Sequence, residues 1–102
     1  MASRRFASFA EFYPFYLSEH ANAISRRLHF TGTSLALGCV VAAITTGNGW
    51  WLVAAPLFGY GFAWVGHCCF ERNRPATFTH PIYSLIGDWI MYRDILTGRI
   101  PF

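Results

Sequence analysis

Charged residues are scarce in this sequence. Only 13% of its 102 residues are Asp, Glu, Lys or Arg, whereas 54% are hydrophobic and 19% are aromatic. Soluble domains carry about 25% charged residues, so this composition argues against a small soluble all-α domain. It favours a protein that is inserted in a lipid bilayer.

Cysteine is also scarce, and its positions follow no regular pattern. The three cysteines are Cys39, Cys68 and Cys69, and this spacing excludes a disulfide framework and a zinc ribbon. We expect them to act as small apolar side chains, with a metal-ligand role for Cys68 or Cys69 as the minor alternative.

Several other sequence signals are missing. The basic pair Arg4-Arg5 is followed by Phe-Ala-Ser-Phe-Ala-Glu rather than by an apolar run, so we expect no signal peptide. No internal repeat and no low-complexity segment is visible. The sequence therefore predicts a single membrane domain over residues 1–102.

Two long segments carry no charge. Residues 28–46 and 50–70 contain 19 and 21 residues, and about 20 apolar residues suffice to cross the hydrocarbon core as a helix. Gly47 and Gly49 in the short connection can adopt the positive φ values that a tight turn needs. The pattern predicts an all-α membrane protein built on a two-span transmembrane helical hairpin.

The flanks of this hairpin are aromatic or amphipathic. Residues 6–20 gather aromatic side chains around Pro14, as at a membrane–water interface. Residues 81–97 place apolar side chains at helical spacing, which predicts an amphipathic helix on the bilayer surface. The aromatic set is Phe6, Phe9, Phe12, Tyr13, Phe15 and Tyr16, and the apolar set is Ile82, Leu85, Ile86, Trp89, Tyr92 and Leu96.

Arginines flank the two spans and are absent from the loop between them. By the positive-inside rule, this distribution places both ends of the chain in the cytoplasm. The net charge of +3 is then a topology signal and does not indicate nucleic acid. The arginines are Arg4, Arg5, Arg26 and Arg27 before the first span, and Arg72, Arg74, Arg93 and Arg99 after the second.

The four histidines are arranged symmetrically about the hairpin turn. His29 precedes Asn48 by 19 residues and His67 follows it by 19, so antiparallel helices bring both rings to the same depth. His20 and His80 lie just outside these positions, so all four can gather at the cytoplasmic mouth. Ionisable residues inside a membrane bundle are functional candidates, and this convergence predicts a metal site. The alternative is that each imidazole bonds a carbonyl or reaches the interface.

Small residues support this placement of the histidines. They recur at helical spacing on each span, in line with its histidine, and small residues let membrane helices approach closely. The two stripes therefore predict the faces along which the helices meet. The stripes are His29, Thr33, Ala36, Val40 and Ala43 on the first span, and Ala55, Gly59, Ala63 and His67 on the second.

The types of candidate ligand restrict the identity of the metal only in part. Imidazole binds iron, zinc, copper and nickel. Glu19, Glu71 and Asp88 near the mouth could add a carboxylate ligand, a partner of a ligand or a base. Two or three histidines with a carboxylate and open positions suit a non-haem iron(II) oxygenase. A closed four-ligand set suits structural zinc, and the spacing leaves both open.

Short motifs along the chain resemble those of a known family. They are Phe12-Tyr13-Pro14-Phe15-Tyr16, His20-Ala21-Asn22, Arg27-Leu28-His29-Phe30, Gly66-His67, Phe70-Glu71 and Asn73-Arg74-Pro75-Ala76, in this order. From about Phe12 to Asp88, the sequence resembles the membrane-bound 2-hydroxy-fatty-acid dioxygenases, of which the fungal 2-hydroxypalmitate dioxygenase is the known activity. The resemblance implies an iron(II)-dependent α-oxidation, in which molecular oxygen shortens a 2-hydroxy fatty acid by one carbon.

The resemblance also implies roles for individual residues. His20, His29 and His67 match the family's histidine positions and would bind Fe(II). His80 follows the shared block and is the fourth candidate ligand, and Glu71 matches the family's acidic position, which implies a catalytic role as a ligand or the partner of one. Two arginines, Arg72 and Arg74, are candidates to bind the fatty-acid carboxylate through paired hydrogen bonds. Their alternative role is in topology and headgroup contact.

Two other functional classes remain open at this point. One is a haem-binding electron carrier with His29 and His67 as axial ligands. The other is a non-catalytic membrane adaptor whose histidines are structural. Because two spans bury little surface, we also expect a homo-oligomer to supply the missing walls of an acyl site.

Overall fold

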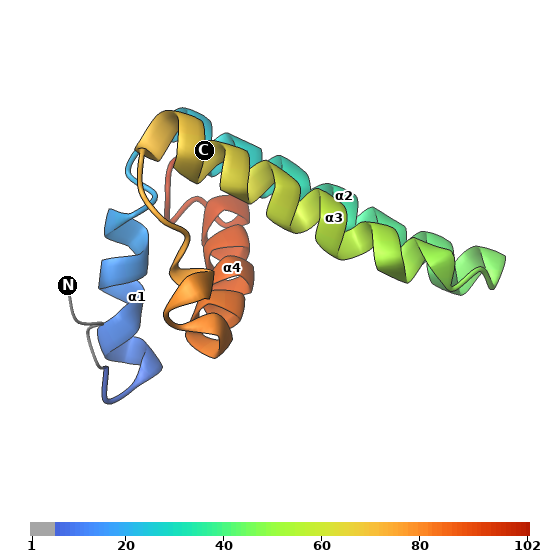
Figure 1. The fold of residues 1–102 in the computed structure, drawn as a ribbon, viewed down its shortest axis with the longest axis horizontal. Helices are drawn as coiled ribbons and strands as arrows, with labels where there is room; N and C mark the ends of the chain where they lie inside the picture. The colour runs from blue at the N-terminus through green and yellow to red at the C-terminus, as the bar shows by residue number, and fades with distance from the viewer. Residues whose placement is uncertain (1–5) are drawn as a thin grey trace.

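Helices joined by short loops make up the computed structural model, which describes residues 6–102 and contains no strand in that range. Two antiparallel helices form a hairpin. They are α2 (Ala23–Thr46) and α3 (Trp50–Val65), and α3 continues as the π-helical turn η1 (Gly66–Glu71). Figure 1 shows the hairpin extending far beyond the rest of the chain, with α1 and α4 at its base. The predicted all-α class is confirmed.

Local sequence sets both ends of α2. The Asn22 side chain accepts hydrogen bonds from the backbone N–H groups of Ile24 and Ser25, which satisfies donors that a helix N-terminus leaves without partners. Gly47 ends the helix with a φ of 69°, a left-handed value that glycine adopts without strain. The helix therefore starts at Ala23 rather than at residue 28, where the uncharged run begins.

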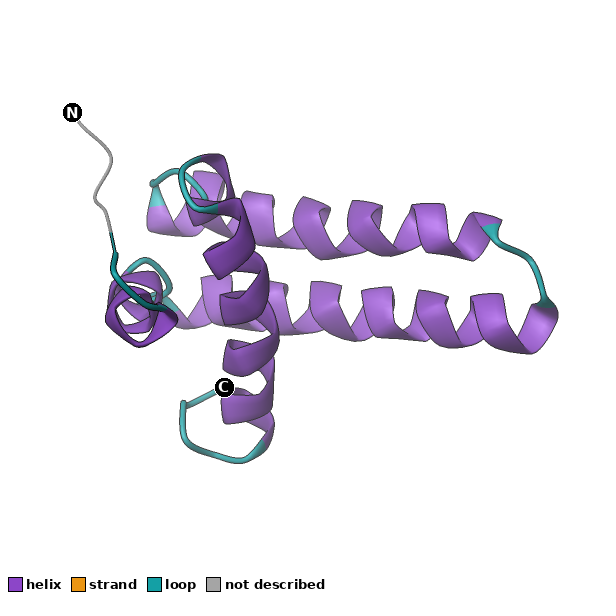
Figure 2. Cartoon of the chain, turned by 90° about the horizontal axis from the view of Figure 1, so that it is seen from below, coloured by secondary structure: helices purple, strands orange, loops and turns teal. Residues whose placement is uncertain are grey.

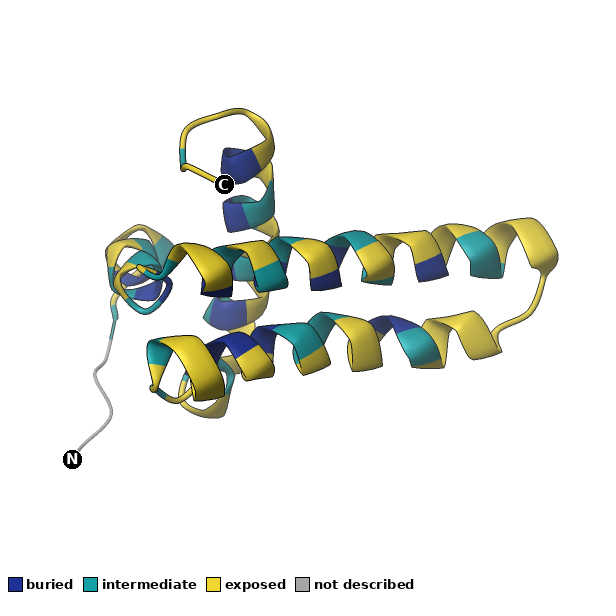
Figure 3. Ribbon diagram, turned by 90° about the horizontal axis from the view of Figure 1, so that it is seen from above, coloured by how far each residue is buried: buried dark blue, intermediate teal, exposed yellow. Residues whose placement is uncertain are grey.

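Both arms of the hairpin are long and apolar enough to cross a membrane. The helices Ala23–Thr46 and Trp50–Glu71 have mean hydropathies of 1.6 and 1.3 over their best windows, and only 22% and 17% of those windows are buried. Ile44 and Trp50, near the turn, are 77% and 76% exposed. Exposed surface accordingly dominates the outer part of the hairpin in Figure 3.

Glycines let the two arms approach closely. A Cβ at Gly32 would lie 2.7 Å from Phe62 Cβ and 2.9 Å from the carbonyl oxygen of Phe58. A Cβ at Gly59 would lie 3.7 Å from Ala36 Cβ, which is ordinary van der Waals contact. At this level the two predicted small-residue stripes face each other.

A smaller layer crosses the base of the hairpin. It contains α1 (Phe9–Ser18), the 3-10 turn η2 (Ala76–Phe78) and α4 (Pro81–Leu96). Figure 2 shows α4 running across both arms. The core of this layer consists of the buried side chains Phe12, Tyr16, Ala76, Met91 and Ile95.

Two aromatic side chains of α1 lie deeper than an interfacial belt. Phe12 and Tyr16 are 0% and 1% exposed. Gly87 of α4 makes room for the Tyr16 ring, because a Cβ at this position would lie 3.0 Å from it. These two side chains therefore pack in the protein core rather than on its surface, because α4 supplies a partner that the local pattern does not reveal.

The helix α4 turns the apolar face predicted for residues 81–97 away from this core. On that face Ile82 is 68% exposed and Trp89 is 45% exposed. The side that faces the protein carries the buried residues Ser84, Gly87 and Met91. The predicted apolar face is therefore left largely exposed.

Candidate metal centre

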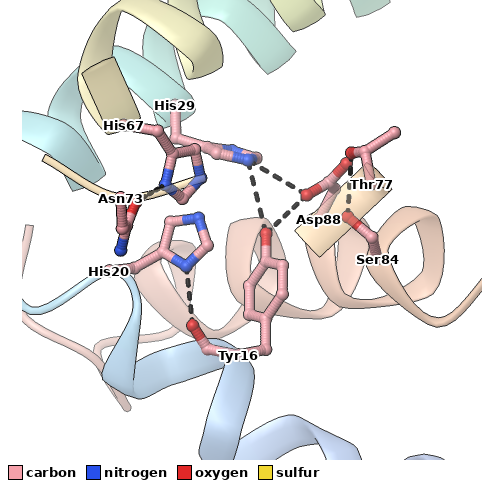
Figure 4. A network of polar contacts seen from close by, with 8 residues as sticks. All are labelled: Tyr16, His20, His29, His67, Asn73, Thr77, Ser84 and Asp88. Atoms are coloured by element: carbon pink, nitrogen blue, oxygen red, sulfur yellow. Dashed lines mark hydrogen bonds and ion pairs between the residues drawn. The ribbon is translucent and has the colours of Figure 1, made fainter. Parts of the chain in front are cut away.

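Three of the four histidines meet where the hairpin joins its base. His20 follows α1, His29 lies in α2 and His67 lies in η1, and all three are at most 5% exposed. The ring centroids of His20 and His67 are 4.5 Å apart, and those of His20 and His29 are 5.2 Å apart. Figure 4 shows the three rings together, with Tyr16, Asn73 and Asp88 around them. The equal spacing from the turn thus brings His29 and His67 to the same depth.

His20 presents a ring nitrogen with no partner to this centre. Its Nδ1 is 2.7 Å from the carbonyl oxygen of Tyr16, and since a carbonyl only accepts, Nδ1 carries the proton. Its Nε2 is buried and has no hydrogen-bond partner within the described part of the chain. Burial, and then the charge of His29, lowers the pKa of His20. The ring is therefore neutral, with its Nε2 lone pair available.

His67 is oriented by the loop that follows it. Arg72 ends η1 with a left-handed φ of 56°, which turns the chain so that the backbone N–H of Asn73 donates to the carbonyl of His67. The Asn73 amide donates to the carbonyl of Glu19, so its Oδ1 accepts from His67 Nδ1 at 2.6 Å. This arrangement fixes the tautomer and leaves Nε2 of His67 as the acceptor.

His29 faces a carboxylate and a phenol. Its Nε2 is 3.0 Å from Asp88 Oδ1 and 3.3 Å from the Tyr16 hydroxyl. The Tyr16 hydroxyl in turn donates to Asp88 Oδ1 at 2.5 Å. Burial, and then the Asp88 charge, raises the pKa of Tyr16, so this phenol keeps its proton.

This donor set suits a metal ion that prefers imidazole and carboxylate. His20 Nε2 has no hydrogen-bond partner among residues 6–102, and the Nδ1 contacts of His20 and His67 leave Nε2 as the acceptor in both rings. Metal-bound histidines commonly donate the opposite ring N–H to a nearby acceptor, as both do here. Asp88 Oδ1 and His29 Nε2 are 3.0 Å apart, and bonds of about 2.1 Å at right angles place two ligand atoms about 3 Å apart. Among residues 6–102, no group of three or more His, Cys, Asp or Glu side chains is arranged so that it could hold a metal ion as it stands. The contact between His29 and Asp88 would have to open or rotate on binding.

The structure places the fourth histidine elsewhere. The His80 ring packs against Phe6 and Phe12, with centroid distances of 5.1 and 5.4 Å. Its Nδ1 is 2.8 Å from Thr79 Oγ1. His80 therefore does not join the other three rings, because the short turn before α4 carries it to the aromatic side of α1.

Of the predicted acidic and basic site residues, Asp88 lies in the centre, whereas the others lie around it. Glu71 Oε1 accepts the backbone N–H of Asn22 at 2.5 Å, so it ties the loop after His20 to the end of η1. Arg72 and Arg74 are exposed and line an open hollow on the outer side of the same loop. Glu19, next to His20, is half-buried, and burial and then the Glu71 charge raise its pKa to about 7.

Little free space remains beside the three rings. A cavity of about 10 Å³ is lined by His29, His67, Tyr16, Tyr60 and Asp88, among others, and this is roughly the space for one water molecule. A haem macrocycle does not fit in this cavity. The predicted axial pair His29 and His67 therefore lacks the room that a haem carrier needs.

The fold and the site together define an all-helical protein in which an apolar hairpin ends in a buried histidine cluster beside a carboxylate. Residues 6–100 match the family described as Mpo1-like, 2-hydroxy-palmitic acid dioxygenase Mpo1-like. The chain belongs to this family, which confirms the resemblance seen in its motifs. No curated protein and no solved structure matched the chain.

Proposed function

We propose that this protein is an integral membrane, iron(II)-dependent dioxygenase that shortens 2-hydroxy fatty acids by one carbon. The observation that carries the proposal is the buried Nε2 of His20, which has no hydrogen-bond partner among residues 6–102 and lies beside the rings of His29 and His67. A buried polar atom without a partner is costly, and a metal ion would satisfy it. Membership of the family, whose name refers to 2-hydroxy-palmitic acid, supports the substrate class.

The membrane part of the proposal is supported by the exposed apolar surface of the hairpin. Core helices of soluble proteins are mostly buried, whereas only 22% and 17% of the two apolar windows are buried here. The arginines near the base, such as Arg26, Arg72 and Arg99, favour a cytoplasmic location for that end. Arg4 and Arg5, which contribute to the same argument, lie outside the described residues.

The proposed ligands are His20, His29 and His67, with Asp88 as the nearest carboxylate. When bound, iron(II) would supply the activation of molecular oxygen. Tyr16 holds Asp88 and reaches His29, so it orients both and keeps a proton at its hydroxyl oxygen. Glu71 acts by fixing the loop that carries His20, which makes it a positioning residue.

The reaction balances without an external reductant when the released carbon leaves as carbon dioxide. The acid R–CH(OH)–COOH and one O₂ give R–COOH, CO₂ and H₂O, so the four electrons that reduce oxygen come from the substrate. The protein's part is to hold the hydroxyl and carboxyl groups near Asp88 and to exclude bulk water. The buried histidines and the small cavity meet that need.

The decisive experiment measures iron in the detergent-purified full chain after anaerobic reconstitution with iron(II). The set is wild type, His20→Ala, His67→Ala and, as a matched control, His80→Ala, each checked for helix content. We expect near-stoichiometric iron in wild type and in His80→Ala and its loss in the other two variants. Oxygen uptake with 2-hydroxyhexadecanoate and formation of pentadecanoate should follow the same order.

Other outcomes separate the competing classes. Wild-type protein that binds no metal would favour the adaptor with structural histidines. Stoichiometric zinc that cannot be exchanged for iron would redirect the site to a structural role. Loss of iron in His80→Ala would show that the fourth histidine belongs to the site after all.

A further inference from the structure

An apolar groove opens on the side of the hairpin, next to the histidine cluster. It lies between α2 and α3, is closed at its base by α4, and has a volume of about 260 Å³. Nearly all of its surface is apolar, and the side chains on its walls include Ala36, Val40, Ala55, Gly59, Leu85 and Trp89. The two small-residue stripes meet at Ala36 and Gly59, and the groove opens beside this contact between the arms.

The groove and the histidine cavity share a wall. Asp88 and Tyr60 line both spaces. The Asp88 side chain is 17% exposed, and its Oδ1 lies 3.0 Å from His29 Nε2. The inner end of the groove is therefore polar and the rest is apolar. A matching ligand has a polar head and an apolar body.

The dimensions select a single chain rather than a helix. From Thr33 to Val40 the groove runs along about 10 Å of α2 at a rise of about 1.5 Å per residue. Over that length, a volume of about 260 Å³ corresponds to a mean cross-section of about 26 Å², whereas a helix about 10 Å in diameter has a cross-section of about 80 Å². A helix from a second copy of this chain is too thick to enter, whereas an extended acyl chain is narrow enough.

The polar inner end of the groove, at Asp88, can accept only a ligand with a small head group. The cavity beyond Asp88 has a volume of about 10 Å³, which excludes a phospholipid headgroup and leaves room only for a group that sits at Asp88 itself. A carboxylate head beside Asp88 would be repelled by the Asp88 carboxylate unless a cation lies between the two. An anionic head therefore requires the metal, whereas an uncharged head of similar size does not.

We propose that this groove holds the acyl chain of a free 2-hydroxy acid, which enters sideways from the bilayer with its head at Asp88 and its chain directed toward Val40. The identity of the head rests on the proposed function, whereas the chain site rests on the groove. Gly59 and Ala36 set the width of the groove, since they are small where the arms touch. Larger side chains there would fill it.

Photo-crosslinking tests the groove without relying on turnover. The full chain, loaded with iron(II) in phosphatidylcholine nanodiscs under argon, is exposed to one of three probes that carry a diazirine in mid-chain. The probes are 2-hydroxyhexadecanoic acid, hexadecanol and phosphatidylcholine, and labelled residues are mapped by mass spectrometry. We expect the acid and the alcohol to concentrate on residues 33–40 and 55–60, and phosphatidylcholine to label lipid-facing positions evenly.

A pair of leucine substitutions on α3 provides the matched comparison. Gly59→Leu should reduce labelling of the groove several-fold. Gly61→Leu should leave it unchanged, because Gly61 lines the opposite face with Leu28 and Phe62 and a Cβ there meets nothing within 4 Å. Val40→Trp, at a position that is 36% exposed, blocks the same groove without burying a new side chain in the packed seam.

The outcomes separate this inference from the proposed function. Three outcomes would contradict an acyl-chain site in the groove. The acid could label lipid-facing positions as strongly as the groove, phosphatidylcholine could label the groove as strongly as the acid, or groove labelling could survive both Gly59→Leu and Val40→Trp. Crosslinked dimers joined through the groove would assign it to a second copy and overturn it too. Groove labelling by hexadecanol in a protein that binds no iron would support the acyl-chain site and contradict the dioxygenase function. Chain shortening without groove labelling would support the dioxygenase function and contradict the acyl-chain site.

Discussion

At the residue scale, the candidate centre depends on hydrogen bonds that decide which ring nitrogen faces inward. The carbonyl oxygen of Tyr16 accepts a hydrogen bond from Nδ1 of His20, and Oδ1 of Asn73 accepts one from Nδ1 of His67. The Nε2 atoms of both rings therefore face the centre. Burial lowers the pKa of His20, so protons do not compete for its lone pair near neutral pH. The tautomer and orientation of both rings are thus fixed by groups that would not themselves bind the metal.

Asn73→Ala tests whether the orientation of the His67 ring contributes to metal binding. The substitution removes the acceptor for His67 Nδ1, so the ring can rotate and change tautomer, and we expect iron(II) affinity to fall by about 10–100-fold. Affinity is measured by competition with a chelator under argon. Asn48→Ala is the matched control, because Asn48 likewise accepts a local hydrogen bond, from the Trp50 N–H in the hairpin turn. Equal affinities in the two variants would contradict an orienting role for Asn73.

The sequence predicted part of this centre and missed the rest for a physical reason. His29 and His67 share a depth because helical rise is regular, so counting from Asn48 was enough. The pairing of Tyr16 with Asp88 joins residues 72 apart in the chain, and it depends on how α4 crosses the hairpin. Local spacing carries no information on that crossing, which is also why His80 was expected in the cluster.

At the element scale, close contact between the hairpin arms depends on individual glycines. Gly32 and Gly38 both lie in α2, but their surroundings differ. A Cβ at Gly32 would overlap Phe62 and the backbone of Phe58, whereas a Cβ at Gly38 meets nothing within 4 Å. The same substitution should therefore have opposite effects at the two positions.

Gly32→Ala should destabilise the hairpin by about 1–3 kcal/mol, as for other overpacked contacts. Gly38→Ala should instead stabilise it by up to about 1 kcal/mol, since alanine favours the helix over glycine. Unfolding of the purified chain by a denaturing detergent, followed by circular dichroism, measures both changes. Destabilisation of similar size in both variants would show that the arms do not pack through Gly32.

A polar contact joins α1 to α4 on the other side of the base. Tyr13 donates to Asp94 Oδ2 at 2.7 Å, and Arg93 donates to Asp94 Oδ1. Burial raises the pKa of Asp94, but the hydrogen bonds from Tyr13 and Arg93 outweigh it and leave the pKa lowered. The stabilisation is therefore complete above the unfolded pKa of about 4 and is lost as the pH falls through the lower folded value.

Tyr13→Phe should consequently cost about 1 kcal/mol near pH 6 and less at an acidic pH below the lowered pKa of Asp94, where its carboxyl is protonated. Thermal unfolding in detergent at the two pH values measures this difference. Tyr83→Phe, in α4, serves as the control for removing a phenol hydroxyl. A penalty for Tyr13→Phe that is the same at both pH values would rule out a contribution from the Asp94 charge.

The elements themselves were largely predictable, unlike their packing. The uncharged runs gave the two arms, and Pro81 and the apolar spacing gave α4. The π-helical turn at Gly66–Glu71 was not predicted. A Cβ at Gly66 would lie 2.9 Å from Ser25 Oγ, so the arms approach closely there, and local spacing carries no information on such a tertiary contact. The burial of Phe12 and Tyr16 has the same kind of cause.

At the scale of the whole molecule, the chain divides into an apolar hairpin and a base that carries the charges. Every Asp, Glu and Arg of residues 6–102 lies in or near the base, whereas the turn at Asn48 has none. If the hairpin crosses a bilayer, the turn and the base lie on opposite sides, with the histidine cluster at the charged end. If the hairpin lies on the surface, both are on the same side.

Cysteine accessibility distinguishes these two arrangements. Cys68 and Cys69 are exposed at the base and Cys39 is buried, so one variant keeps Cys68 alone and a second carries only Asn48→Cys. With a membrane-impermeant maleimide on sealed inside-out and right-side-out vesicles, we expect Cys68 to react from the cytoplasmic side and Asn48→Cys from the other, because arginine-rich segments stay in the cytoplasm. Reaction of both from one side would mean that the hairpin does not span, and the groove would then open to water or to a partner instead of to lipid. Reaction from opposite sides but with the base outside would leave the groove in the bilayer and would place the iron site in the compartment opposite to the one proposed.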